Sequence, residues 1–200
     1  MEMSAYKNYW RRVCDAIKRL VATKSKFGQE RMSAFPNWQQ FAVHQRRNDT
    51  GCIPTGYEML LRAAGAKGID FKTFQDDFDL DQHGGQPRNH FVSVGEAIKK
   101  KYPNVDYVCE PFAKGKGAEK LARVEERVQN RQPVLISLAQ TPVGGWHIMP
   151  VVDSDANSVT LLEHVDKDGN VHTKTIQKTD FVTRHDYWKG GDEIAYITKF

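Results

Sequence analysis

A cysteine and a histidine, far apart in the chain, are the residues with the clearest capacity for chemistry. Cys52 follows Gly51 and precedes a stretch of helical periodicity, whereas His147 follows two glycines and a tryptophan at the start of an apolar strand. A thiol attacks a carbonyl carbon when a base takes its proton, and imidazole is the commonest such base. Taken alone, each residue is more often structural than catalytic. Together they indicate acyl-transfer chemistry, provided that the fold brings them to one place.

The helix that follows Cys52 is predicted to run from about Pro54 to Ala64. Proline is favoured in a first helical turn, and Gly65 suits the left-handed residue just past a last turn. Apolar residues recur along this stretch at helical spacing, so one side of the helix is expected to be buried. The unpaired N–H groups and the positive dipole end of a helix N-terminus stabilise a thiolate. We therefore expect the pKa of the Cys52 thiol to lie below its ordinary value.

Length and composition place the chain among ordinary globular proteins. Of its 200 residues, 40% are hydrophobic and 27% are charged. No stretch approaches the ~20 apolar residues of a membrane span, and the N-terminus lacks the apolar core of a signal peptide, so we expect a cytoplasmic protein. Cys14, Cys52 and Cys109 are widely separated, which disfavours a disulfide framework and a thiolate zinc site. We expect no cofactor and no metal.

Positive charge is concentrated at the N-terminal end of the chain. Residues 1–50 contain ten Lys or Arg and four Asp or Glu, whereas residues 51–200 contain 19 and 21. Apolar residues at steps of three and four predict an amphipathic helix over about residues 4–23. We therefore expect a basic helix and linker over residues 1–35 and a main domain over residues 36–200. The basic region could meet an acidic partner, but no nucleic-acid-binding motif accompanies it, so a solvated face is favoured.

The order of the predicted elements indicates the fold class. Helices are predicted over about residues 91–101 and 118–130, with a short strand at 105–109 between them. Further strands are predicted at about 132–138, 146–152, 158–165, 171–176 and 193–198. Helices early in the chain and strands late are typical of α+β folds rather than of alternating parallel units.

Three segments resemble those of a known family, the papain-like cysteine peptidases. Residues 45–65 run from a glutamine through glycine-cysteine to a helix that ends in glycine, residues 132–137 form an "x-x-P-V" strand, and residues 145–153 form the histidine strand. Their order is similar to that of a small bacterial branch, the peptidase domains that remove double-glycine leader peptides from bacteriocins. The resemblance implies a helical subdomain that carries the cysteine, packed on an antiparallel half-barrel that carries the histidine.

Carried over by position, the resemblance makes Cys52 the nucleophile and His147 the residue that takes its proton and later protonates the leaving group. It implies a peptidase of peptides or proteins, or a related acyl transferase. One alternative is a papain-like module that has lost catalysis and only binds a peptide or protein. Another is a metal protein, which the absence of H-E-x-x-H and C-x-x-C spacing disfavours. Its ligands would be His147, His164, His172 and His185.

The resemblance also implies an oxyanion hole, in which Gln45 would supply a side-chain N–H beside the main-chain N–H of Cys52. Gln45 precedes the cysteine by seven residues, one more than the commonest papain-like spacing, so Gln40 is the alternative. Arg46 and Arg47 come next, and they suggest that acidic side chains or a carboxylate of the substrate lie near the site.

A third residue is implied to orient the imidazole of His147. Sixteen residues further along the chain, where the family usually has Asn or Asp, this sequence has Glu163. A glutamate can hold an imidazole, although it departs from the family pattern. Asp153 is the alternative, and its position suggests a residue at the end of a strand. Ile53 also departs from the family, which often has glycine directly after its cysteine.

Overall fold

The computed structural model describes residues 32–33, 37–47, 51–79, 90–142, 144–187 and 192–200. These residues belong to one compact unit, Met32–Phe200. The basic helix predicted over residues 4–23 lies outside the described ranges, so the division of the chain at residues 35 and 36 stays a prediction. None of the helices in the described part is long and apolar enough to cross a membrane.

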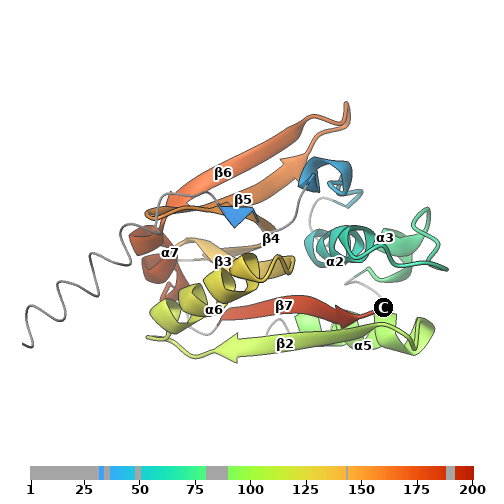
Figure 1. Cartoon of the computed structure of the whole chain (residues 1–200), viewed down its shortest axis with the longest axis horizontal. Coiled ribbons are helices and arrows are strands. Elements are labelled where there is room, and N and C mark those ends of the chain that lie inside the picture. Colours follow the sequence, from blue (N-terminus) through green and yellow to red (C-terminus); the bar gives the residue numbers. More distant parts are fainter. Residues whose placement is uncertain (1–31, 34–36, 48–50, 80–89, 143, 188–191) are drawn as a thin grey trace, which may run out of the picture. The chain divides into compact units, whose positions relative to one another are not determined.

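An antiparallel sheet forms the centre of this unit (Figure 1), in the order β2-β7-β3-β4-β5-β6, with the short β1 paired to β4. The strands are β1 (Met32–Ser33), β2 (Asp106–Phe112), β3 (Val134–Thr141), β4 (Gly144–Ser154), β5 (Ser158–Val165), β6 (Val171–Gln177) and β7 (Asp192–Lys199). All six strands predicted from the sequence are present. The α+β fold class predicted from the order of elements is confirmed.

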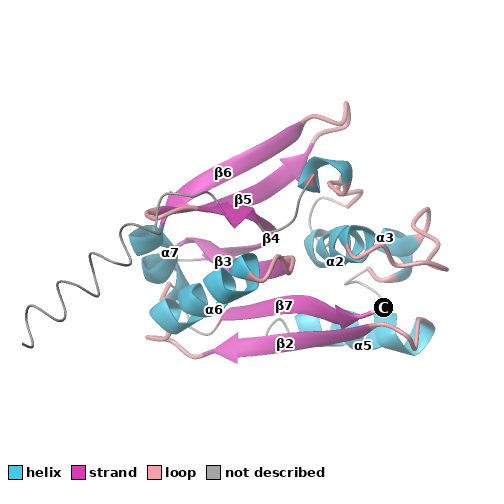
Figure 2. Ribbon diagram, viewed as in Figure 1, coloured by secondary structure: helices cyan, strands magenta, loops and turns pink. Residues whose placement is uncertain are grey.

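The helices gather in two groups on this sheet (Figure 2). One group comprises α2 (Cys52–Ala63), the short α3 (Phe74–Asp77) and α5 (His90–Lys101), and the other comprises α6 (Gly117–Gln129) and α7 (Lys178–His185). A 3-10 turn, η1 (Trp38–Gln40), precedes them. The short α3 and α7 were not predicted, because helices of four and eight residues bury only two residues each and show no clear periodicity.

Strands β3 and β7 contribute side chains to hydrophobic cores on both faces of the sheet, which explains their largely apolar sequence. In β3, Ile136 and its alternate neighbours pack against α6 and α7, whereas Leu135 packs against α2 and α5. In β7, Ile194 belongs to the core beneath α6 and α7, and Ala195 belongs to the core beneath α2 and α5. Successive side chains of a strand point to opposite faces of the sheet. The sheet therefore lies between two hydrophobic cores, and one helix group packs on each face.

Helix α2 approaches β3 very closely at Gly56. A Cβ atom on this residue would lie 2.8 Å from Cδ2 and 2.9 Å from Cδ1 of Leu135, which is itself fully buried. Real Cβ atoms do not approach that closely, so the absence of a side chain lets the helix backbone rest on the leucine. The position of α2, and of the cysteine at its first residue, therefore depends on this glycine.

Gly56→Val tests that dependence. The added carbons overlap Leu135, so the free energy of unfolding should fall by about 1–3 kcal/mol, measured by urea unfolding followed by circular dichroism. Lys100→Val places the same β-branched residue at an exposed position of α5 and should cost less than about 1 kcal/mol. Equal costs for the two variants would contradict the close packing.

Candidate active site

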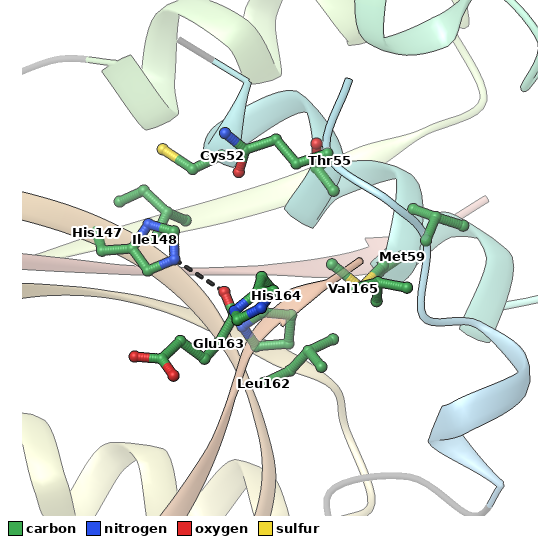
Figure 3. Close-up of a pocket in the computed structure, with 12 residues that line it drawn as sticks. Cys52, Thr55, Met59, His147, Ile148, Leu162, Glu163, His164 and Val165 are labelled. Carbon is green, nitrogen blue, oxygen red and sulfur yellow. Dashed lines mark hydrogen bonds between the residues drawn. The ribbon is translucent and has the colours of Figure 1, made fainter. Parts of the chain in front are cut away.

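The fold brings Cys52 and His147 to the same pocket (Figure 3), although 95 residues separate them in the sequence. Cys52 is the first residue of α2, and His147 lies near the beginning of β4. The pocket has an empty volume of about 280 Å³, part of which is open to solvent. Much of its wall is apolar, formed by Val43, Met59, Ile148, Pro150, Leu162 and Val165. The thiol and the imidazole therefore line one cavity, although they come from different elements of the fold.

The Cys52 thiol is more shielded from water than its position at a helix start suggests. Burial raises the pKa of the Cys52 thiol above its ordinary value, and this outweighs the lowering effect of the main-chain N–H groups of Ile148, Ile53 and Cys52 itself. The expectation of a lowered pKa was wrong, because desolvation of the charged sulfur exceeds the stabilisation by helix N–H groups. The resting thiol is therefore protonated near neutral pH, and it needs a base to become a nucleophile.

The imidazole of His147 is held in the orientation and tautomer of a base. Its Nε2 lies 3.0 Å from the main-chain carbonyl oxygen of Glu163 on β5. A carbonyl can only accept, so Nε2 carries the proton and the other ring nitrogen, Nδ1, has the free lone pair. The hydrogen bond leaves Nδ1 as the nitrogen able to take a proton.

The residue predicted to orient this ring does so through its backbone rather than its side chain. The Glu163 carboxylate points away from the ring in Figure 3 and lies 3.5 Å from Nζ of Lys174. Asp153, the alternative, lies six residues beyond His147 on β4, which corresponds to about 20 Å of strand, and accepts a hydrogen bond from its neighbour's N–H at 2.9 Å. The structure thus brings the Glu163 carbonyl to the ring and places Asp153 far along the strand.

Of the two candidate glutamines, Gln45 lines the pocket, whereas Gln40 is exposed in η1. Nε2 of Gln45 donates to the carbonyl oxygen of Arg47 at 2.5 Å, and the N–H of Gly51 donates to the same oxygen at 3.1 Å. A Cβ on Gly51 would lie 2.5 Å from that oxygen and 2.9 Å from Cγ of Gln45. The glycine before the cysteine therefore allows the Gln45 loop to lie directly against the start of α2.

The arginines that follow Gln45 are engaged within the protein. Nη1 of Arg46 lies 3.2 Å from a carboxylate oxygen of Asp76, and Nε of Arg47 lies 2.6 Å from a carboxylate oxygen of the buried Asp79. These internal ion pairs compensate the positive charge from which an acidic substrate was inferred. The arginines thus attach the loop to the α3 segment, and an acidic group of the substrate near them stays a prediction.

The four histidines of the metal-protein alternative do not form one cluster, although His147 and His164 line the same pocket. The rings of His164 and His172 stack with their centroids 4.2 Å apart on neighbouring strands, while His185 is buried on α7 and its Nε2 donates to the carbonyl of Ala113 at 2.9 Å. Across the described ranges, no group of three or more His, Cys, Asp or Glu side chains could hold a metal ion. The structure therefore gives the metal alternative no support.

Two residues beside the pocket were not identified from the sequence. His44 precedes Gln45, and its Nδ1–H donates to the carbonyl of Val165 at the end of β5 with a distance of 2.6 Å. Gln75 is buried in α3 and bonds to the main chain on both sides of Gln45. Neither residue belongs to a motif, and the stretch around Gln75 has no clear periodicity, so no local signal could have identified them.

The pH dependence of thiol alkylation tests the environment of Cys52. The rate with iodoacetamide should rise through a midpoint above that of an exposed cysteine, because burial favours the neutral thiol. Cys109, whose pKa burial raises to about 12, should react more slowly in the native protein. Peptide mass mapping measures both rates, and the two midpoints should converge on the ordinary value of about 8.5 in urea. A native Cys52 midpoint below about 7 would instead indicate a resting thiolate–imidazolium pair.

Comparisons with known proteins agree with this architecture. No family model and no curated protein matches the sequence. Among solved structures, the chain is similar to a candidate C39-like peptidase from Bacillus anthracis, with a TM-score of 0.54 and 18% identity, covering 86% of this chain and 99% of that one. It is also similar to UfSP from C. elegans, with a TM-score of 0.49 and 12% identity, covering 86% of this chain and 35% of that one. The chain has the α+β fold of the papain-like cysteine peptidases.

Proposed function

We propose that the protein is a cysteine peptidase, or a closely related thiol acyl transferase, that acts on peptides or proteins through a thioester on Cys52. One observation carries the proposal: Cys52 and His147 line one pocket, and the hydrogen bond from Nε2 of His147 to Glu163 leaves Nδ1 free to take a proton. The similarity in fold to the C39-like peptidase from Bacillus anthracis supports the same chemistry.

In the first half of the reaction, the Cys52 thiol gives its proton to Nδ1 of His147 as the sulfur attacks the carbonyl carbon of the scissile amide. The carbonyl oxygen then carries the negative charge of a tetrahedral intermediate. When the C–N bond breaks, the imidazolium returns the proton to the leaving amine and a thioester remains. Because burial keeps the thiol neutral at rest, the proton transfer to His147 accompanies the approach of the substrate rather than preceding it.

In the second half, the thioester is transferred to water or to another nucleophile. His147 takes a proton from the incoming molecule, whose oxygen or nitrogen attacks the thioester carbon, and it then returns that proton to the departing Cys52 sulfur. Water as acceptor gives a peptidase, and an amine as acceptor gives an acyl transferase. Both outcomes use the same residues.

Gln45 and the main-chain N–H of Cys52 would stabilise the oxyanion in both halves. The side-chain amide of Gln45 has two N–H groups, one of which can donate to Arg47 while the other is directed elsewhere. Gln45 lines the pocket that contains the sulfur, as an oxyanion donor must. Gln40, exposed in η1, is not proposed for this role.

Cys52→Ala tests the central step. It should abolish peptide cleavage. Cys109→Ala removes a thiol on β2 that does not line the pocket, so it should leave cleavage intact. The measurement is mass-spectrometric detection of products from a peptide library incubated with each variant. Cleavage that survives Cys52→Ala would rule out the thioester mechanism. A wild type that cleaves nothing but binds peptides equally well with and without the Cys52 sulfur would be a non-catalytic module.

The role of Glu163 has its own test. We propose that Glu163 acts through its main-chain carbonyl, so Glu163→Gln should change turnover by less than about threefold, whereas His147→Ala should lower it by about 10²–10⁴-fold. Asp153→Asn, far along β4, is the matched control and should behave like wild type. Loss of turnover in Glu163→Gln comparable to that in His147→Ala would show that the carboxylate orients the ring.

A further inference from the structure

We propose that Gln75 is a positioning residue that fixes Gln45 relative to Cys52, and thereby holds the oxyanion hole in place. The proposal rests on the proposed function, because it assigns Gln75 to the support of a catalytic step. Gln75 lies on α3, belongs to no motif, and is 3% exposed. Its side chain bonds to Arg46, Thr55, His44 and Glu58 rather than to the sulfur or the imidazole, so its effect would act through Gln45.

The Gln75 amide binds the main chain on both sides of Gln45. Its Oε1 accepts a hydrogen bond from the N–H of Arg46 at 2.9 Å, and its Nε2 donates to the carbonyl of His44 at 3.0 Å. These peptide groups flank Gln45 directly. One side chain thus fixes the backbone from which the Gln45 side chain extends.

The same amide is attached to the helix that begins with Cys52. Its Oε1 accepts from the hydroxyl of Thr55 at 2.9 Å, and its Nε2 donates to a carboxylate oxygen of Glu58 at 2.9 Å. Thr55 and Glu58 are both buried on α2. Gln75 therefore links the loop of the proposed oxyanion donor to the helix of the proposed nucleophile.

The link is rigid because every hydrogen-bonding position of the amide is occupied. Two donors and two acceptor sites meet four partners, and both Arg46 N–H and His44 carbonyl have fixed polarity. Rotating the amide by half a turn would oppose oxygen to oxygen and N–H to N–H. Glu58 is in turn held by Arg62, with Oε1 2.7 Å from Nη2. Losing the amide would leave buried polar groups of the loop and of α2 unsatisfied.

The expected consequence is a displaced oxyanion donor in a folded protein. Other contacts still hold the loop, including the hydrogen bond from the His44 ring to the Val165 carbonyl and the ion pair between Arg46 and Asp76. Gln45 should therefore move slightly rather than be released. A misplacement of about 1 Å can cost about 10²-fold in rate when it changes the geometry around a reacting centre.

The experiment uses p-nitrophenyl acetate, which needs no knowledge of the natural substrate. The Cys52 thiol gives its proton to His147 as the sulfur attacks the acetyl carbon and an oxyanion forms. The C–O bond then breaks to release p-nitrophenolate and leave acetyl-Cys52, and the proton passes from His147 to solvent. Iodoacetamide alkylation of the same sulfur is the reference reaction, because displacement at its saturated carbon forms no oxyanion. The ratio of the two rates reports the oxyanion hole separately from the reactivity of the thiol.

Gln75→Leu should slow acylation by about 10–100-fold and leave alkylation of Cys52 within about twofold of wild type. Gln75→Glu, which keeps the acceptor but loses both donors, should act in the same direction and serves if the leucine variant does not fold. Gln132→Leu is the matched control. Gln132 lies in the loop between α6 and β3, does not line the pocket, and donates through Nε2 to the carbonyl of Ile197 on β7 at 3.1 Å. It should leave the ratio unchanged.

A double-mutant comparison decides whether Gln75 acts through Gln45. In a Gln45→Ala background, Gln75→Leu should slow acylation by less than about threefold, since the group that it positions is gone. The same large factor in both backgrounds, or equal losses of acylation and alkylation, would overturn the positioning role while leaving the proposed function intact. Acylation that is absent from the wild type, or that persists in Cys52→Ala, would overturn the proposed function and this inference with it.

Discussion

The close packing of α2 on the central strands is the constraint on which the site depends. Gly56 lets the helix backbone rest on Leu135 of β3, and the start of the same helix meets Ile148 of β4, whose N–H faces the Cys52 sulfur. His147 is the adjacent residue on that strand. A single helix-on-sheet contact therefore determines how a thiol from the helical group and an imidazole from the sheet come to share one pocket.

The same packing explains the chemistry of the thiol. A sulfur held between a helix and a sheet loses water, and burial outweighs the helix N–H groups in setting its pKa. The resting site thus holds a neutral thiol in the same pocket as an imidazole whose Nε2–H donates to the Glu163 carbonyl. Because the thiolate is the reactive form of a cysteine, a thiol kept neutral by burial depends on a nearby base for its reactivity.

Sequence patterns were sufficient for the elements whose burial is periodic. The apolar run at 134–138 and the alternation in later strands predicted the sheet, and the Pro54 and Gly65 signals predicted α2, with Gly65 in the left-handed conformation at φ 72°. Cys52 and His147 could also be nominated, because a thiol at a helix start and a histidine beside glycines are local features. Their meeting required the fold.

The remaining features depend on contacts between distant segments, which no local pattern encodes. The group that orients His147 is the main-chain carbonyl of Glu163. Every residue has such a carbonyl, so the sequence cannot single one out, and the prediction rested on the Glu163 carboxylate, which instead lies beside Lys174. The ion pairs of Arg46 with Asp76 and of Arg47 with Asp79 also join segments that no sequence motif connects. Gln75 joins segments up to 31 residues apart in sequence, and its role is visible only in three dimensions.

The protonation of the His147 ring is the most direct measurement of this account, because the proposed chemistry requires a free lone pair on Nδ1. Nitrogen-15 NMR of the ring, recorded at about pH 8 where a histidine is neutral and assigned with His147→Gln, distinguishes the two tautomers. The account predicts a proton on Nε2, none on Nδ1, and a change in the Nδ1 signal on Cys52→Ala. A proton on Nδ1, or an Nδ1 signal indifferent to removal of the sulfur, would contradict it.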